Sequence, residues 1–327
     1  MTKLGEIDDS AMAHLVYAEV DRQFPSTAAG INAVMRHGML PFGKMLGPRL
    51  VIRSALAVGG SVEQVLPAAV AVECVQTGAM MHDDIIDQDT VRRGRQAAHV
   101  AYDRNTAIIA GDSLFLAGVA AVARCFDAGV DAERVNRAVQ GLARGAQLIG
   151  AGAAEELTLA RNVCPVEEYL SMITKKSGSW LWMACHLGAV LGGGDESEID
   201  ILGAYGTLLG TGYQIRDDLM PFDGKDHGKP HVSDVRNGRP TLPVLIAHQR
   251  ATTAQRSTIE RLLTDTASPV DELHDALVNL VQTTGAVQPS YDLARRYASQ
   301  AREVLRGLPH SRHRDALEDI TKPGRLV

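Results

Sequence analysis

Apolar residues recur at helical spacing along most of the chain, and no segment shows the strict alternation of a half-buried strand. Two helices, predicted over residues 67–88 and 196–220, are apolar on nearly every face. A helix without a polar face lies inside its bundle, so both are expected to be central. The other predicted helices cover residues 10–22, 29–38, 43–58, 105–126, 131–157, 166–192, 240–250, 254–265, 270–284, 287–307 and 311–320. The pattern predicts an all-α bundle.

The start of the first central helix carries two signals. Ser61 and Gln64 have the spacing of a capping box. Pro67 fits the first turn of a helix better than its interior, because proline has no backbone N–H to donate. We therefore predict that this helix begins at Pro67.

Both central helices end in aspartates, and a basic segment follows each of them. The first motif is His82-Asp83-Asp84-Ile85-Ile86-Asp87, followed by Arg92-Arg93-Gly94-Arg95; the second is Gln214-Ile215-Arg216-Asp217-Asp218, followed by Lys225, Lys229, Arg236 and Arg239. Carboxylates at the C-terminal end of a helix meet the negative end of its dipole, so they need a cation nearby. Several carboxylates on one turn suit Mg²⁺, and nearby arginines can bind phosphate oxygens. A surface salt-bridge cluster is the alternative, but an apolar helix that runs into three acids is a poor surface element.

Composition narrows the possible classes of protein. The 327 residues contain no linker, charge block or low-complexity tract, so one domain over residues 1–327 is predicted. Apolar residues make up 45% of the chain and aromatic residues 4%, which suits a helical core of small and aliphatic side chains. A net charge of -6 disfavours general nucleic-acid binding, which requires a basic surface.

Several features favour a cytoplasmic protein. The four cysteines lack zinc-site spacing, and Cys74, Cys125 and Cys185 fit buried thiols in a reducing compartment. The N-terminal residues lack the basic and apolar regions of a signal peptide. The longest apolar stretch, around Leu114 to Ala123, is too short to cross a bilayer, so no transmembrane segment is expected.

The two acidic motifs and the segments after them resemble the aspartate-rich motifs of trans-polyprenyl diphosphate synthases, including bacterial geranylgeranyl diphosphate synthases. Further matches in the same order are Gly43-Lys44, Pro48, Gly111-Asp112, Lys176-Ser177, Gly228-Lys229-Pro230, Ser233-Asp234 and Gly238-Arg239-Pro240. The resemblance spans about residues 40–250. It implies a single-domain, isoprenoid-synthase-type helical bundle around a central apolar cavity, usually a homodimer. It also implies a reaction that joins isopentenyl diphosphate to an allylic prenyl diphosphate.

The resemblance further implies roles for individual residues. It places about three Mg²⁺ ions on five metal ligands, which are Asp83, Asp84, Asp87, Asp217 and Asp218. The residues matched to the allylic diphosphate site are Arg92, Lys176, Lys229 and Arg239, the last where the family usually has lysine. The residues matched to the isopentenyl diphosphate site are Lys44, Gln76 and Arg93. The expected catalytic residues are Lys176, Ser177, Gln214 and Lys229, of which Ser177 and Gln214 match positions beside the forming cation.

Two positions depart from the family pattern. The second motif usually has another aspartate where this chain has Pro221, but two aspartates suffice when phosphates complete the ligands of Mg²⁺. Asp223 is a candidate for a water-mediated contact. Gly47 stands where the family normally has an arginine that binds isopentenyl diphosphate. Loss of such a contact is worth about 1.5–3 kcal/mol, or roughly ten- to hundredfold in affinity. Arg49 and Arg53 are candidate substitutes at unmatched positions.

Product length in this family depends on the bulk of the residues below the first aspartate motif. Gly78, Ala79 and Val75 occupy this stretch, and none of them is aromatic. Eight residues of helix rise about 12 Å, which leaves room for roughly two to three isoprene units. A C20 product, geranylgeranyl diphosphate, or a longer one is therefore expected. Trp180 and Trp182 are interpreted as core or dimer packing rather than as the floor of this pocket.

Three functions follow from these observations. The leading prediction is a Mg²⁺-dependent trans-prenyltransferase that makes geranylgeranyl diphosphate or a longer homologue. Gly47 and Pro221 leave open a terpene-synthase-like lyase, which would ionise a prenyl diphosphate and then cyclise it or eliminate a proton. The third reading is a non-catalytic subunit of a heteromeric synthase, and it is weaker because most ligand positions are retained.

Overall fold

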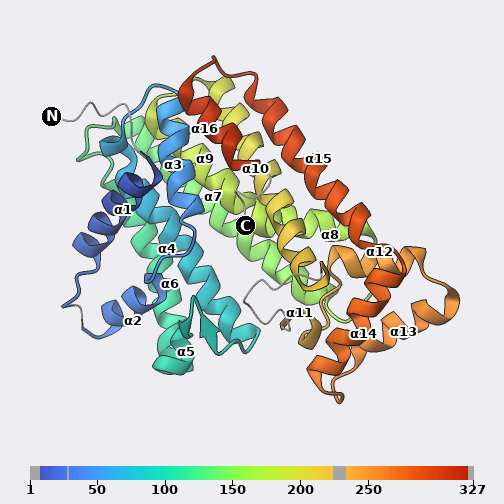
Figure 1. Ribbon diagram of the computed structural model, residues 1–327. Coiled ribbons are helices and arrows are strands. Elements are labelled where there is room, and N and C mark those ends of the chain that lie inside the picture. Colours follow the sequence, from blue (N-terminus) through green and yellow to red (C-terminus); the bar gives the residue numbers. More distant parts are fainter. Residues whose placement is uncertain (1–7, 28, 224–232, 323–327) are drawn as a thin grey trace. The chain divides into compact units, whose positions relative to one another are not determined.

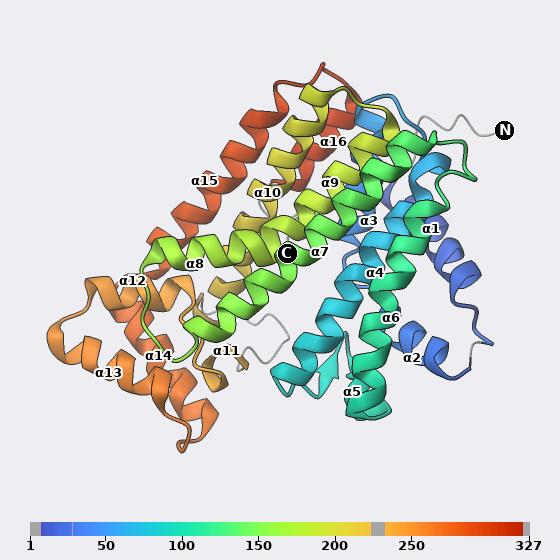
Figure 2. The ribbon, with the colours of Figure 1, turned by 180° about the vertical axis from the view of Figure 1, so that it is seen from behind.

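The computed structural model describes residues 8–27, 29–223 and 233–322. Almost all secondary structure in these residues is helical, which confirms the all-α prediction (Figure 1; Figure 2). The chain divides into two compact units. The first unit comprises Met1–Gln147, Trp180–Gly206 and Val304–Ile320, and the second comprises Leu148–Ser179, Thr207–Glu303 and Thr321–Val327. A single domain over residues 1–327 stays a prediction.

The first unit is built around a pair of long helices, α4 (Val62–Ile86) and α6 (Arg104–Ala123), which lie side by side in both views (Figure 1; Figure 2). Gly78 permits this close approach, because a Cβ there would lie 2.8 Å from the carbonyl oxygen of Gly111. α4 also contacts α1, α2, α3 and α5, so it is central to this unit as predicted. The other elements are α1 (Asp9–Gln23), α2 (Ile31–Met39), α3 (Leu46–Ala57), β1 (Val91–Arg92), β2 (Arg95–Gln96), α5 (Ala98–Ala101), α9 (Ser179–Gly192), α16 (Arg312–Ile320) and parts of α7 (Ala132–Leu159) and α10 (Glu196–Leu219).

The first central helix begins earlier than predicted. The Ser61 hydroxyl accepts a hydrogen bond from the backbone N–H of Gln64, and the Gln64 side chain accepts one from the backbone N–H of Ser61, so the capping box is present. Pro67 lies inside α4, and the prediction that the helix starts there was wrong. The capping box and the burial of Val62 and Val65 outweigh one missing N–H donor in the second turn.

α6 corrects the expectation about apolar stretches. It has 20 residues, and its most apolar window has a mean hydropathy of 1.8, so its length and composition suffice to cross a membrane. It is alone in this among the helices of the described ranges. The apolar stretch expected from the sequence was shorter, because Asp112 divides the run of apolar residues. A core helix meets the same criteria, and α6 packs along α4.

The second unit contains shorter helices from the C-terminal half of the chain. α12, α13 and α14 pack on one another and share an apolar core with Phe222 and Val235 (orange and gold in Figure 1). Another apolar cluster, which includes Tyr169, Ile215 and Leu219, surrounds the end of α10. The elements of this unit are the end of α7, α8 (Val166–Ile173), the end of α10, α11 (Ser233–Arg236), α12 (Leu242–Arg250), α13 (Thr253–Thr264), α14 (Val270–Thr283) and most of α15 (Val287–Leu305).

Two irregular turns of the second unit coincide with sequence motifs. A π-helical turn, Thr174–Gly178, interrupts the helix predicted over residues 166–192 and contains Lys176 and Ser177. A 3₁₀ turn, Met220–Phe222, follows α10 and contains Pro221. Each turn spans five residues or fewer, which is too short for the periodicity of apolar residues to distinguish from an α-helix.

Candidate active site

The end of α4 carries the first aspartate cluster, as predicted. Asp83 and Asp87 lie one turn apart and share a face of the helix. Asp83 is half-buried, Asp87 is buried, and Asp84, on a neighbouring face, is only 2% exposed. This arrangement, with Asp83 and Asp87 on one face and Asp84 beside them, is the one that the sequence predicted.

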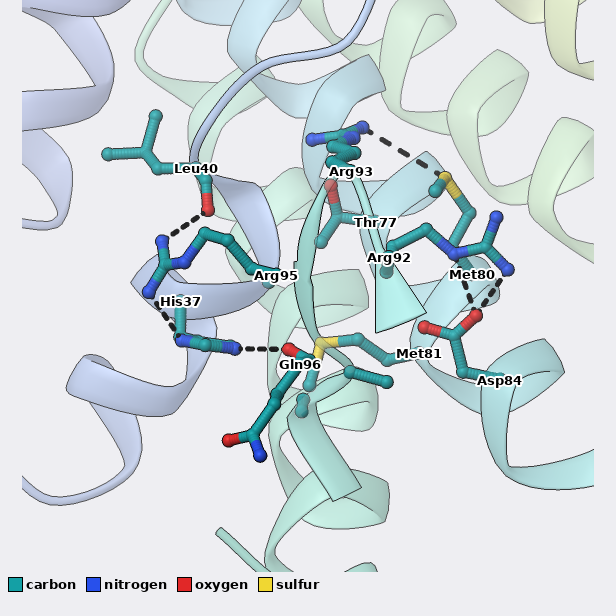
Figure 3. A pocket seen from close by; sticks show the side chains of 13 residues that line it. His37, Leu40, Thr77, Met80, Met81, Asp84, Arg92, Arg93, Arg95 and Gln96 are labelled. Carbon is teal, nitrogen blue, oxygen red and sulfur yellow. Dashed lines mark hydrogen bonds and ion pairs between the residues drawn. The ribbon is translucent and has the colours of Figure 1, made fainter. Parts of the chain in front are cut away.

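The basic segment after α4 folds into an antiparallel hairpin of β1 and β2, in which Arg92 pairs with Arg95. Strands of two residues are too short to show an alternating pattern, so the sequence did not predict them. Arg92 Nε donates a hydrogen bond to Asp84 Oδ1 at 2.7 Å, and Arg92 Nη2 donates to the same oxygen (Figure 3). Burial raises the pKa of Asp84, and Arg92 opposes that shift. Arg92 is therefore paired with an acid of the first cluster.

The residues matched to the isopentenyl diphosphate site all belong to the first unit. Lys44 lies two residues before α3, and Gln76 is half-buried on the face of α4 that carries Asp83. Arg93, in the hairpin turn, donates from Nη2 to Glu73 Oε1 at 2.9 Å and forms a buried ion pair.

A pocket beside the hairpin collects basic side chains. Its lining includes Arg92, Arg93, Arg95 and Asp84 (Figure 3). Arg95 donates to the carbonyl oxygen of Leu40 at 2.9 Å, which fixes its position at the rim. Three guanidinium groups against one carboxylate give this region a positive character that suits an anionic ligand.

Gly47 is buried in the first turn of α3. A Cβ there would lie 2.8 Å from Val72 Cγ1 and 3.3 Å from Trp180 Nε1. A larger side chain therefore requires that one of these neighbours move. Arg49 and Arg53, the candidate substitutes for the missing arginine, both pair with an aspartate of α1.

The chain-length residues lie on different sides of α4. Gly78 faces the backbone of α6, and Val75 Cγ2 lies 3.3 Å from the position of a Cβ at Gly118, also on α6. Ala79 is half-buried and shares the face of Asp83. The role of all three in product length stays a prediction, for which Ala79 has the most suitable position.

The second aspartate cluster lies at the end of α10. Asp217 is exposed, whereas Asp218 is buried and accepts hydrogen bonds from the Tyr169 hydroxyl at 2.5 Å and from Gln214 Nε2 at 2.7 Å. Burial raises the pKa of Asp218 to about 8, and neighbouring carboxylates add to the shift. Gln214 Oε1 accepts a hydrogen bond from Ser177 Oγ at 2.5 Å. The structure thus brings together Ser177 and Gln214, the two residues predicted to lie beside the forming cation.

Lys176 and Arg239 meet at one carboxylate of α7. Glu156 Oε2 accepts a hydrogen bond from Lys176 Nζ at 2.6 Å and lies 3.2 Å from Arg239 Nη2. Arg239 also pairs with Asp234 at 3.3 Å. Two of the four cations predicted for the allylic diphosphate therefore lie together. Lys229, another of the four, falls outside the described residues, as does Lys225.

The segment after Asp218 differs from a regular continuation of the helix. Pro221 lies in the 3₁₀ turn. Asp223 accepts a hydrogen bond from the Tyr291 hydroxyl at 2.7 Å. Burial raises the pKa of Tyr291 to about 12, with a further contribution from Asp223. The proposed water-mediated role of Asp223 would have to coexist with this bond.

The aspartates of the two clusters can supply only part of the ligands that Mg²⁺ requires. Within the described ranges, no three acidic, histidine or cysteine side chains gather closely enough to hold a metal ion by themselves. Mg²⁺ usually takes one or two carboxylates and completes its octahedron with water and substrate phosphates. Asp83 with Asp87, and the exposed Asp217, offer that kind of partial set.

Three supporting residues were not predicted as parts of the site. Glu73 could have been found, because it is the lone acid in the apolar part of α4. Tyr169 and Glu156 gave no such signal, because their partners Asp218 and Lys176 lie 49 and 20 residues away in the chain.

Comparisons with known proteins agree with this geometry. The sequence model of the polyprenyl synthetase family matches residues 29–280. The chain is 34% identical over 282 residues to the short chain isoprenyl diphosphate synthase of Methanothermobacter thermautotrophicus, covering 85% of this chain and 84% of the relative. It is 33% identical over 298 residues to the geranylgeranyl pyrophosphate synthase of Geoglobus acetivorans, covering 89% of each. The crystal structure of geranylgeranyl pyrophosphate synthetase from Pyrococcus horikoshii is similar with a TM-score of 0.86, 28% identity and 94% coverage of both chains.

Proposed function

Because the chain belongs to the polyprenyl synthetase family, we propose that it is a Mg²⁺-dependent prenyltransferase that joins isopentenyl diphosphate to an allylic prenyl diphosphate. The retention of both aspartate clusters, each at the end of a long helix, carries this proposal. Relatives named as geranylgeranyl and geranylfarnesyl diphosphate synthases support a product of C20 or longer.

The proposed first step breaks the allylic C–O bond and leaves a carbocation and a diphosphate with added negative charge. Bound Mg²⁺ supplies positive charge to that leaving group. Lys176 and Arg239 add fixed positive charge, and Glu156 holds both side chains in place. The residues that would hold the metal are Asp83, Asp84, Asp87, Asp217 and Asp218.

The proposed second step joins the carbocation to the double bond of isopentenyl diphosphate. Lys44, Gln76 and Arg93 would bind the diphosphate of this second substrate. Ser177 donates to Gln214, which donates to Asp218, so these hydrogen bonds fix the orientation of the Gln214 amide beside the cation. The new cation then loses a proton, for which the departing diphosphate is the proposed acceptor.

A labelling experiment tests this proposal. The purified protein is incubated with labelled isopentenyl diphosphate, farnesyl diphosphate and Mg²⁺, and the products are separated by chain length. A labelled diphosphate of C20 or longer is expected. A failure to incorporate label under these conditions would show that the protein does not catalyse the condensation.

Gly47 supports a second candidate, a lyase that acts on a preformed prenyl diphosphate. The packing of Val72 and Trp180 against Gly47 leaves no space for the arginine that the family uses for the second substrate. Incubation with geranylgeranyl diphosphate and Mg²⁺ alone distinguishes the two candidates. A hydrocarbon or alcohol product would favour the lyase, whereas an unchanged substrate would favour the prenyltransferase.

A homodimer is the proposed assembly, with α6 at the interface. Its outward side exposes Ile109 by 56% and Leu116 by 72%, and Phe126, just beyond the helix, by 60%. Apolar patches of this kind commonly mark interaction surfaces. Leu116→Asp should convert the dimer into a monomer, and light scattering measures this change in mass. Leu157→Asp, at an exposed leucine of α7, is the matched control, and a monomeric unsubstituted protein would contradict the proposal.

A further inference from the structure

Glu73 is a buried acid in the apolar part of α4. Its side chain is 4% exposed, and its neighbours Val72 and Cys74 are fully buried. Burial raises the pKa of Glu73, and the charge of Arg93 opposes that shift. A carboxylate in such surroundings is costly unless it is paired, so its partner must be held closely.

Arg93 is held by more than this one partner. Its Nη2 donates to Glu73 Oε1 at 2.9 Å. The same nitrogen approaches Met80 Sδ at 3.9 Å (Figure 3). Its Nη1 donates to the carbonyl oxygens of Met39 at 2.9 Å and Pro41 at 3.2 Å. These contacts use both terminal nitrogens of the guanidinium group. Among the described residues, none accepts a hydrogen bond from Nε.

Gly43 leaves the Nε edge of Arg93 accessible. A Cβ at Gly43 would lie 3.5 Å from Nε, which is ordinary contact distance, so any side chain there would cover this N–H group. Gly43 and the following Lys44 are exposed. One N–H of Arg93 therefore points at the segment that carries a second cation.

We propose that Glu73 is a positioning residue, which holds Arg93 so that its Nε edge, beside Gly43, binds the diphosphate of the second substrate. The proposal rests on the proposed function and specifies how one of its binding residues works. Arg93 then binds the anion through one N–H and its charge, because the protein already occupies the fork formed by its two terminal nitrogens. Lysine cannot replace Arg93, because a single ammonium group cannot reach these separate acceptors as a planar guanidinium does.

Two substitutions test the two halves of this arrangement. Glu73→Gln keeps the volume of the side chain but removes the charge that orients Arg93. Gly43→Ala leaves Glu73 and Arg93 intact and places a methyl group over Nε. Each should raise the KM for isopentenyl diphosphate about tenfold or more, as expected for a weakened charge-assisted contact. The kcat and the KM for the allylic substrate should change less than about twofold, because the contact stabilises the second substrate equally in the ground state and in the transition state.

Glu19→Gln is the matched control for a purely structural effect. Glu19 is another buried acid of the first unit, and it accepts hydrogen bonds from Arg22 at 2.9 Å and from Gln23 at 2.7 Å. This variant should lower the melting temperature without changing either KM. The proposal is overturned if Glu73→Gln and Gly43→Ala leave the KM for isopentenyl diphosphate unchanged. If Glu73→Gln does not fold, Gly43→Ala decides the outcome alone.

Calorimetry separates this inference from the proposed function. Isopentenyl diphosphate is titrated into the unsubstituted protein and into Gly43→Ala, with no allylic substrate present. Weaker binding to the variant supports the inference even if turnover is absent, and equal binding overturns it. If the unsubstituted protein neither binds isopentenyl diphosphate nor incorporates it, both the proposed function and the inference are wrong.

Discussion

Asp84 and Asp218 are both nearly inaccessible, but Asp84 is paired with a charged side chain and Asp218 with two neutral ones. Arg92, eight residues further along the chain, donates to Asp84 from the hairpin. Tyr169 and Gln214 donate to Asp218 without compensating its charge. The charge of Arg92 opposes the rise that burial causes in the pKa of Asp84, whereas Asp218 has only neutral donors and burial raises its pKa to about 8. The two clusters are thus prepared differently for the same proposed ligand.

The largest expected effect is the loss of catalysis when one aspartate of either cluster is replaced. Asp83→Asn and Asp217→Asn each remove one proposed ligand of Mg²⁺, one per cluster. Each should lower kcat by about 10²–10³-fold, in line with the loss of a group that stabilises transition-state charge. Steady-state kinetics at saturating Mg²⁺ would measure this. Asp275→Asn, at a side chain that is 86% exposed, is the control and should leave kcat unchanged.

The charged support of the first cluster should matter more for stability than the neutral support of the second. Arg92→Ala leaves Asp84 buried without its partner, so the free energy of unfolding should fall by about 3 kcal/mol. Adding Asp84→Asn should restore part of that loss, because the buried charge is then absent. Denaturant unfolding measures both. Equal stability of the single and double variants would contradict the idea that the unpaired charge is responsible.

A titrating group away from both clusters provides a reference for pH effects. His186 stacks on Trp182, with ring centroids 4.6 Å apart, and burial lowers its pKa to about 4. The charged neighbours that also affect this pKa are Arg137, Arg144, Asp200 and Glu196. His186 stays neutral in the folded chain, so the unfolded chain binds the extra proton between pH 6.5 and 4.

The contribution of His186 to stability is therefore complete above pH 6.5 and is lost as the pH falls toward 4. The loss should amount to roughly 3 kcal/mol. His186→Phe keeps an aromatic ring but cannot titrate, so unfolding measured at several pH values should show a shallower acid dependence. The assignment fails if the two proteins lose stability in parallel.

The neutral support of the second cluster should produce the smallest effect. Tyr169→Phe removes the hydroxyl donor to Asp218 but keeps the ring in its apolar cluster. The free energy of unfolding should fall by about 1–2 kcal/mol. A loss as large as that of Arg92→Ala would show that the two clusters are supported equally strongly, against the comparison above.

Local patterns in the sequence predicted much of the fold and part of the site. The periodicity of apolar residues located the two central helices, and the aspartates were correctly placed at their ends. α4 starts before Pro67, because the capping box at Ser61 sets the beginning of the helix and proline is tolerated in its second turn. The helix predicted over residues 105–126 is present as α6, but its apolar stretch is longer than expected, because Asp112 interrupts the run of apolar residues without ending the helix.

Contacts between distant residues could not be predicted in the same way. The pairing of Arg92 with Asp84 is an exception, because it spans only eight residues and both partners belong to one sequence motif. Glu156 meets Lys176 and Arg239 across the packing of α7 with other segments, which no local spacing encodes. The closed space around Gly47 likewise depends on Val72 and Trp180, which lie far away along the chain.

Calorimetric titration of Mg²⁺ tests the central claim most directly, namely that both clusters recruit the metal to a prenyl diphosphate. The titration is run with and without an unreactive allylic diphosphate analogue, on the unsubstituted protein and on Asp83→Asn and Asp217→Asn. Strong Mg²⁺ uptake that requires the analogue and is weakened by either substitution is the predicted result. Absence of Mg²⁺ uptake in the presence of the analogue, or uptake that neither substitution changes, would contradict the account.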